Sequence, residues 1–143
     1  MPYSFVEGAT MADVAFEATG KNLEELFESA GKAVTKSMIE NIESIEEETS
    51  VEFSLNHGSV DRLLHDFLDE LVYYKDAENL FFSGYMLKIR KEEGKYYLEA
   101  MLKGEKINPD KHELVVNVKA VSWHKYEVKK KEDAWKAFVI LDV

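Results

Sequence analysis

Hydrophobic and polar residues alternate in three segments of the first half of the chain, which predicts short β-strands there. Residues 3–7 and 13–18 both show this period of two, and residues 8–10 break the pattern between them. Residues 51–55 alternate strictly. Side chains on a strand point alternately to its two faces, so each of these segments predicts one apolar face and one polar face.

Two longer segments have apolar residues three and four positions apart, which is the period of an α-helix. The first follows Asn22 and Glu25, whose spacing is that of a capping box. The second follows Ser59, the expected N-cap, and has Asp61 in its first turn, near the positive end of the helix dipole. The predicted buried stripes are Leu23, Leu26, Phe27, Ala30, Val34 and Met38 in the first helix, and Leu63, Leu64, Phe67, Leu68, Leu71 and Val72 in the second.

The second half of the chain has the pattern of β-structure. The expected elements are a hairpin of residues 81–91 and 95–103, a turn at 108–110, one long strand at 114–129, and a last strand at 134–142 that pairs with it. The grouping of helices and hairpins predicts an α+β fold in two layers, with two helices packed on a largely antiparallel β-sheet. We expect a single domain that covers residues 1–143.

Composition narrows the class of protein. The chain has 143 residues, 45% of them hydrophobic, and no cysteine, so thiol catalysis and thiolate metal sites are excluded. No apolar run approaches the roughly 20 residues of a membrane span, and the start lacks a signal-peptide pattern, so we expect a cytoplasmic protein. The net charge of −10 argues against tight direct binding to nucleic acid and fits a basic partner or a bound cation.

Few polar residues stand out as candidates for chemistry. The sequence has no Gly-rich phosphate loop, no HExxH and no GxSxG, and its four histidines are scattered. We read the acidic stretch 40–50 as a solvated connection. Asp142 ends the apolar run 135–141, where its carboxylate and the α-carboxylate of Val143 form either a solvated strand end or half of a hard-cation site.

Lys119 lies among apolar residues of the predicted long strand. A lysine there must reach the surface or meet carboxylates, since burying an unpaired ammonium costs several kcal/mol. Two readings follow, an edge lysine that extends to solvent or a partner of Asp13 and Asp142.

The sequence resembles the archease family over nearly its whole length. The matching pieces, in order, are residues 11–16, 20–27, 61–64, 67–71, 104–105, 112, 118–124 and 139–143. Two departures occur: Thr10-Met11 stand where many archeases have His-Thr, and Asn117 stands where an acidic residue is common.

The resemblance implies a function. Archeases are activators, not enzymes, of the GTP-dependent 3′-phosphate (RtcB-type) RNA ligase of tRNA splicing; they promote its guanylylation and multiple turnover. They bind a divalent cation, for which calcium is the first expectation and magnesium or manganese the alternatives. Carried over to this chain, the metal ligands are Asp13 and Asp142, with Asp61 and Val143 as additions, and Lys119 is a functional residue beside them.

Two other functions compete with this one. A chaperone-like module would hold an RNA-modifying enzyme through its acidic surface, with a purely structural metal. A metal-dependent hydrolase would use the carboxylates directly, but no histidine or second carboxylate is poised as a general base.

Overall fold

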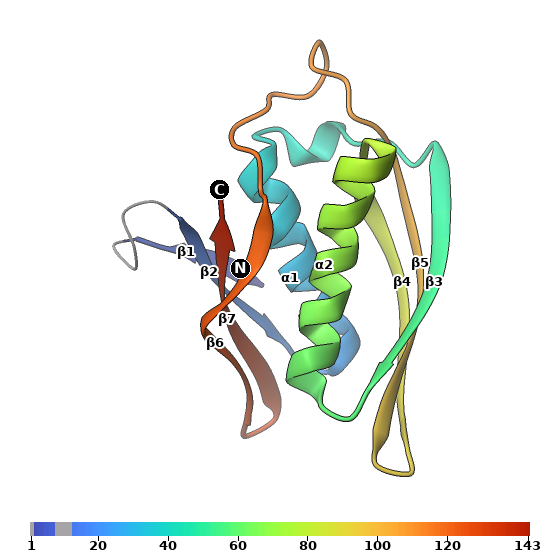
Figure 1. The fold of residues 1–143 in the computed structure, drawn as a ribbon, viewed down its shortest axis with the longest axis vertical. Coiled ribbons are helices and arrows are strands. Elements are labelled where there is room, and N and C mark those ends of the chain that lie inside the picture. The colour runs from blue at the N-terminus through green and yellow to red at the C-terminus, as the bar shows by residue number, and fades with distance from the viewer. Residues whose placement is uncertain (1, 8–12) are drawn as a thin grey trace.

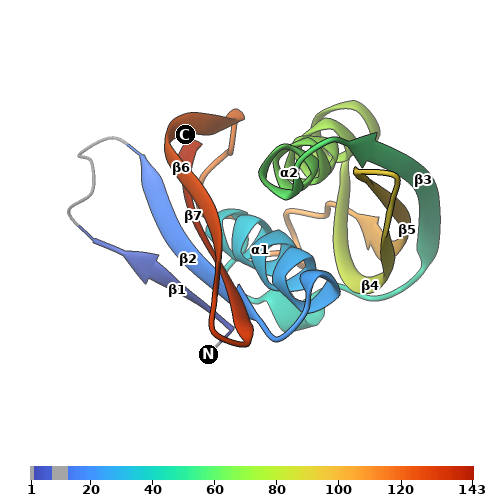
Figure 2. The same cartoon turned by 90° about the horizontal axis from the view of Figure 1, so that it is seen from below.

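Two antiparallel sheets enclose two helices in the computed structural model, which describes residues 2–7 and 13–143. The first sheet has the order β1-β2-β7-β6 and the second has the order β3-β5-β4 (Figures 1 and 2). The strands of the first sheet are β1 (Tyr3–Val6), β2 (Val14–Gly20), β6 (Ala120–Lys131) and β7 (Ala134–Asp142). Those of the second are β3 (Thr49–His57), β4 (Leu80–Glu92) and β5 (Lys95–Lys106).

Helices α1 (Leu23–Met38) and α2 (Val60–Glu78) lie between the sheets, as Figure 2 shows, and each contacts strands of both. A short 3-10 helix, Ile42–Ser44, follows α1. The predicted class, α+β with two helices on antiparallel strands, is confirmed. The strands nevertheless form two sheets where we expected one. Each helix has a wide apolar surface, and it buries that surface against strands of both sheets.

The core runs between the two sheets. The Phe27 and Phe67 rings, one from each helix, are 5.6 Å apart and fully buried. Phe16 of β2 is fully buried on the side of the first sheet. Leu98 and Leu102 of β5 are fully buried on the side of the second sheet. Burying each such side chain stabilises the folded state by about 1.5–3 kcal/mol, and this is the main contribution to the stability of the fold.

The start of α1 agrees with its prediction. The Asn22 side-chain oxygen accepts a hydrogen bond of 2.9 Å from the Glu25 N–H, and Glu25 in turn accepts from the N–H of Lys21. The start of α2 agrees only in position, because Ser59 is the N-cap but its hydroxyl makes no capping hydrogen bond.

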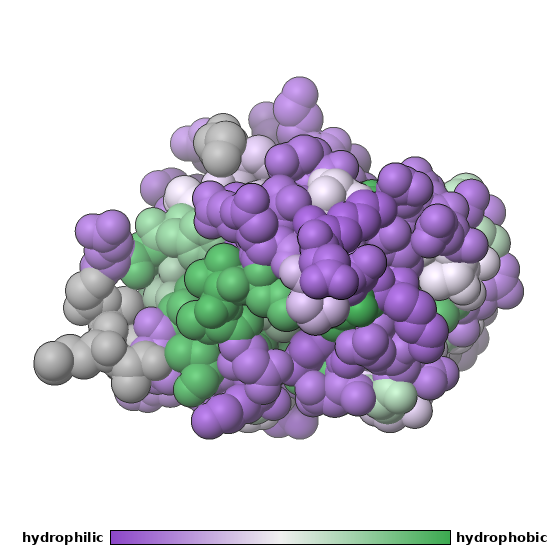
Figure 3. Space-filling model, turned by 90° about the horizontal axis from the view of Figure 1, so that it is seen from above, coloured by the Kyte–Doolittle hydropathy of each residue, from purple (hydrophilic) through white to green (hydrophobic). Residues whose placement is uncertain are grey.

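The prediction of one long strand at 114–129 is wrong for the first residues of that range. Strand β6 begins at Ala120, and residues 113–119, which we call the strap, approach it from the second sheet. A segment that passes between sheets cannot pair with a neighbouring strand along its length, and the strap has one isolated bridge, between Leu114 and Ile39. Seen from above, this end of the molecule has a hydrophobic patch bordered by hydrophilic residues (Figure 3).

Candidate metal site

Asp13 immediately precedes β2 and Asp142 is the last residue of β7, so the two aspartates lie at the same end of this antiparallel strand pair. Val14 pairs with Leu141, and Asp13 precedes the first of these while Asp142 follows the second. Continuing the antiparallel register by one residue puts the two aspartates opposite each other, and such pairs have Cα atoms roughly 5 Å apart. The tertiary structure therefore brings together two residues that are distant in sequence.

Both aspartates are half-buried, and within residues 2–7 and 13–143 neither carboxylate has a hydrogen-bond or ion-pair partner. Two unpaired carboxylates side by side repel each other, and a divalent cation relieves that repulsion. Oxygen donors of this kind suit calcium, magnesium or manganese, so the residues present fit a hard-cation site. Val143 follows directly, half-buried, with its side chain packed on the core.

Lys119 lies in the strap, not in a strand, and is exposed. Its main-chain N–H donates a hydrogen bond of 2.8 Å to the carbonyl oxygen of Asp142. Its ammonium group forms no ion pair with any residue of the described chain. The structure thus places Lys119 beside the aspartate pair through its backbone and leaves its charge facing solvent.

Asp61 is anchored elsewhere. It is exposed in the first turn of α2, and its carbonyl oxygen accepts a hydrogen bond of 2.6 Å from the Tyr126 hydroxyl. Tyr126 lies six residues along the chain from Ala120, which pairs with Asp142. The structure does not gather Asp13, Asp61 and Asp142 into one group with oxygens within 4.8 Å of one another, since the described residues contain one such group and it has other members. A ligand role for Asp61 stays a prediction.

Lys75 of α2 holds the strap in place. Its buried ammonium donates hydrogen bonds of 2.6 Å to the Asn117 side-chain oxygen and to the Val118 carbonyl, and it pairs with Asp76 at 2.7 Å. Asn117 therefore keeps an oxygen where many archeases have an acidic residue. The other departure, Thr10-Met11, lies outside the described residues.

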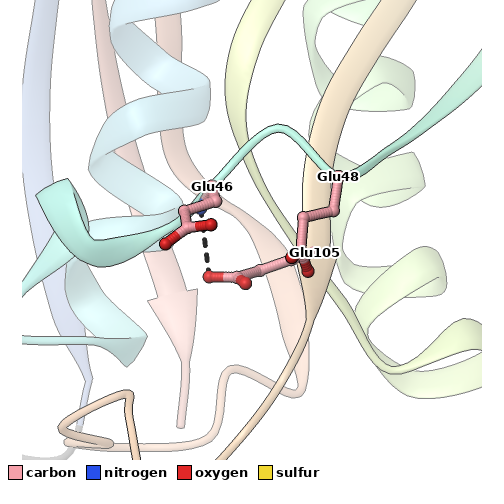
Figure 4. A group of neighbouring side chains, drawn as sticks. All are labelled: Glu46, Glu48 and Glu105. Atoms are coloured by element: carbon pink, nitrogen blue, oxygen red, sulfur yellow. Dashed lines mark hydrogen bonds between the residues drawn. The ribbon is translucent and has the colours of Figure 1, made fainter.

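Glu46, Glu48 and Glu105 form the carboxylate group that the sequence did not reveal (Figure 4). Buried Glu105 accepts hydrogen bonds from Lys111 at 3.0 Å, from His112 Nε2 at 2.9 Å and from the Glu46 N–H at 3.0 Å. Burial alone would raise the pKa of Glu105, but these donors outweigh it and lower that pKa to about 2. Lys111 also pairs with Glu46 at 3.2 Å, so the Lys111 ammonium already compensates part of the negative charge of this carboxylate group.

This network corrects our reading of residues 40–50 as merely solvated. It fixes the 105–112 turn against the segment that follows α1. Glu105 and His112 both lie in segments that resemble the archeases, but it is the folding of the chain that brings their side chains into contact. The His112 Nδ1 atom accepts from the Asn108 N–H at 2.9 Å, so Nε2 carries the proton that it donates to Glu105.

A second missed cluster joins α2 to β6. The His65 ring stacks on Trp123 with centroids 3.6 Å apart and planes within 2°. His65 Nε2 donates to the Val121 carbonyl at 3.0 Å, and its Nδ1 atom is 3.2 Å from the Asp69 carboxylate. Burial and the carboxylates of Asp61, Asp66 and Asp69 raise the pKa of Tyr126, which makes edge contact with His65.

None of the described helices combines the length and the apolar character needed to span a membrane.

The sequence of this chain is similar to those of known proteins over nearly its whole length. The chain matches the Archease protein family (MTH1598/TM1083) over residues 3–143. It is 34% identical over 133 residues to the protein archease of Pyrococcus furiosus, which is 92% of this chain and 93% of that protein. It is 34% identical over 142 residues to the protein archease of Methanosarcina mazei, covering 99% and 95% of the two chains.

The fold agrees with the sequence matches. The solution structure of Methanobacterium thermoautotrophicum protein 1598 superposes with a TM-score of 0.86 at 32% identity and covers 99% of both chains. The matched family, the relatives and the shared fold confirm the resemblance drawn from the motifs: the chain belongs to the archease family.

Proposed function

We propose that this protein activates the GTP-dependent 3′-phosphate RNA ligase of tRNA splicing, promoting its guanylylation and multiple turnover. Family membership supports a role in association with the tRNA-splicing ligase. The relatives bear the name "Protein archease", which states no reaction, and the proposed role is that of an activator without catalysis of its own.

The observation that carries the proposal is the Val14–Leu141 pair, because it brings Asp13, just before β2, and Asp142, at the end of β7, to the same end of neighbouring strands. These two carboxylates would hold a divalent cation, calcium in the first place, with the main-chain oxygens of Val143 as further donors. The bound cation supplies positive charge that attracts phosphate oxygens. Asp13 and Asp142 would keep that charge at a fixed point because the last three residues of β7 before Asp142, residues 139–141, are all buried.

Lys119 adds a second cationic group at the same end. Its backbone is tied to Asp142, and its free ammonium faces solvent, where it would meet the ligase or the nucleotide that the ligase binds. Asp61 would join only after a movement of its side chain or of the N-terminus of α2 toward the aspartate pair. We place it outside the central pair of ligands and keep its role as a prediction.

A ligation assay tests the proposal directly. The purified cognate ligase is given excess RNA ends and GTP, with and without this protein, and product formed per ligase molecule is counted. The proposal expects turnover to continue beyond one product only when this protein is present, and to stop when a chelator removes free calcium while the ligase's own metal is supplied separately. Equal turnover with and without the protein would refute it.

A further inference from the structure

We propose that the strap, residues 113–119, is the surface by which this protein docks on its partner, and that it takes an apolar side chain flanked by lysine or arginine. The inference rests on the proposed function for the identity of the partner, the ligase. It rests on the structure for the place and the chemistry of the contact.

Three neighbouring apolar side chains of the strap are exposed. Leu114, Val115 and Val116 have 50%, 54% and 37% of their surface accessible. Exposed apolar residues scattered singly are ordinary, but a contiguous patch marks an interaction site in a protein that must stay in solution. Figure 3 shows hydrophobic side chains gathered at this end and bordered by hydrophilic ones.

The strap is held firmly although it is not a strand. Main-chain hydrogen bonds of 2.8 Å join Val115 to Met38, Glu40 to Glu113 and Lys119 to Asp142. Lys75 donates to Asn117 and Val118 from below. A surface already fixed in one shape loses little conformational entropy on binding, which favours affinity.

A cavity of about 420 Å³ opens beside these side chains. Its apolar walls include Met38, Phe81 and Ile107, and its polar walls include Lys75 and Asp76. Interfaces concentrate their binding energy where an apolar anchor fills such a pocket. The volume suits one or two large side chains, not an extended strand.

Acidic groups border the apolar patch. Glu40 and Glu113 flank the strap beside the end of α1, and Asp76 lies at the cavity. Glu40 pairs with Lys36 and Asp76 with Lys75, so Glu113 is the acidic group of this rim that has no ion-pair partner among the described residues. This charge, in a chain of net charge −10, complements a basic partner. The hydrogen bond from Lys119 to Asp142 joins the patch to the proposed metal end, so one partner surface would cover both.

Binding of the purified ligase to the full-length protein tests the inference. Val115→Asp places a charge in the patch and leaves the backbone hydrogen bond of this residue intact. Met86→Asp is the matched control, because Met86 is similarly exposed (60% against 54% for Val115) on the second sheet. We expect Val115→Asp to weaken the Kd at least about tenfold and Met86→Asp to leave it within about twofold. Calcium binding by the free protein should be unchanged in both, since neither residue is a proposed ligand.

A second variant, Glu113→Lys, keeps the test sharp if Val115→Asp fails to fold. It reverses a charge of the rim and should weaken ligase binding most at low salt. Tight ligase binding by wild type that both folded variants retain would overturn the docking surface and leave the proposed function standing. Absence of any binding by wild type would instead refute the proposed function. A concentration-dependent dimer that Val115→Asp abolishes without changing ligase affinity would also overturn the inference, because a second copy would then be the occupant.

Discussion

The N–H of Lys119 donates a hydrogen bond of 2.8 Å to the carbonyl oxygen of Asp142, so the strap and the end of β7 are one connected unit. Ala120 pairs with Asp142 directly after this contact, and the neighbouring pair of Val14 with Leu141 brings Asp13 to the same end of β2 and β7. A metal ligand at a strand end is positioned only as well as the strands on either side hold it. Here β2 holds one side and the strap with β6 holds the other.

Removal of either central aspartate should abolish high-affinity calcium binding without unfolding the protein. In Asp13→Asn and Asp142→Asn the fold survives because each change also relieves repulsion between neighbouring carboxylates. A calcium titration measured by calorimetry should show that the affinity of the protein for calcium falls at least about a hundredfold, since few metal ligands remain. Asp133→Asn, in the exposed β6–β7 turn, is the control and should bind as wild type does. Unchanged affinity in both aspartate variants would place the metal elsewhere.

Glu105 should make stability depend on pH in the acid range. Its folded pKa of about 2 lies below the ordinary value of 4.5, so it stabilises the fold fully above pH 4.5 and loses that contribution as the pH falls toward 2. Glu105→Gln should lower the free energy of unfolding by ~1–2 kcal/mol at pH 7 and flatten its fall between these values. Urea unfolding at several pH values measures this. A variant with the full acid dependence of wild type would show that other groups cause it.

Loss of Lys75 should loosen the strap. Lys75→Met keeps the volume of the side chain but leaves the Asn117 oxygen and the Val118 carbonyl without their donor. The Val118 carbonyl is buried, whereas Asn117 is exposed and its oxygen can bind water instead. One unsatisfied buried acceptor costs about 1–3 kcal/mol, and we expect a loss of that size. Hydrogen exchange should show faster exchange of the Lys119 amide, whose bond to Asp142 depends on the strap. Exchange as slow as in wild type would mean that the main-chain bonds suffice.

Gly104 should tolerate no side chain. A Cβ atom there would lie 1.8 Å from the Phe81 carbonyl oxygen and 2.7 Å from the Phe82 Cα, both backbone atoms that cannot turn aside. Gly104→Ala should therefore cost ~2–3 kcal/mol or more through displacement of β4 at its bulge. Gly58→Ala is the control, because the space around its Cβ is open. Equal melting temperatures for the two variants would contradict this account.

Local patterns sufficed to predict both helices, the β4–β5 hairpin and β7. The Asn22 cap, the stripes through Phe27 and Phe67, and the alternation in β3 are all set by neighbours in sequence. The division into two sheets and the strap were not predictable in this way. Val115 and Val116 have the composition of a strand, and only the path between the sheets denies them partners.

The candidate site divides in the same manner. Two strand ends and a family resemblance predict Asp13 and Asp142 as metal ligands, and the register of β2 and β7 puts them at the same end of neighbouring strands. Metal binding by this pair stays a prediction. The Glu105–His112–Lys111 network depends on a turn folding back on segment 40–48, and no spacing rule encodes it. The stacking of His65 on Trp123 likewise needs the irregular stretch of β6 between Ser122 and Glu127, which turns Trp123 toward α2.

The rate of ligase guanylylation with Asp142→Ala, set beside a thermal melt of the same variant, tests the central claim most directly. The measurement uses purified ligase and GTP with saturating calcium, and compares wild-type activator, the variant and no activator. The account predicts that the variant melts within a few degrees of wild type yet gives the rate seen without activator. Full stimulation by a stably folded Asp142→Ala protein would contradict the metal-dependent mechanism and favour a chaperone-like role.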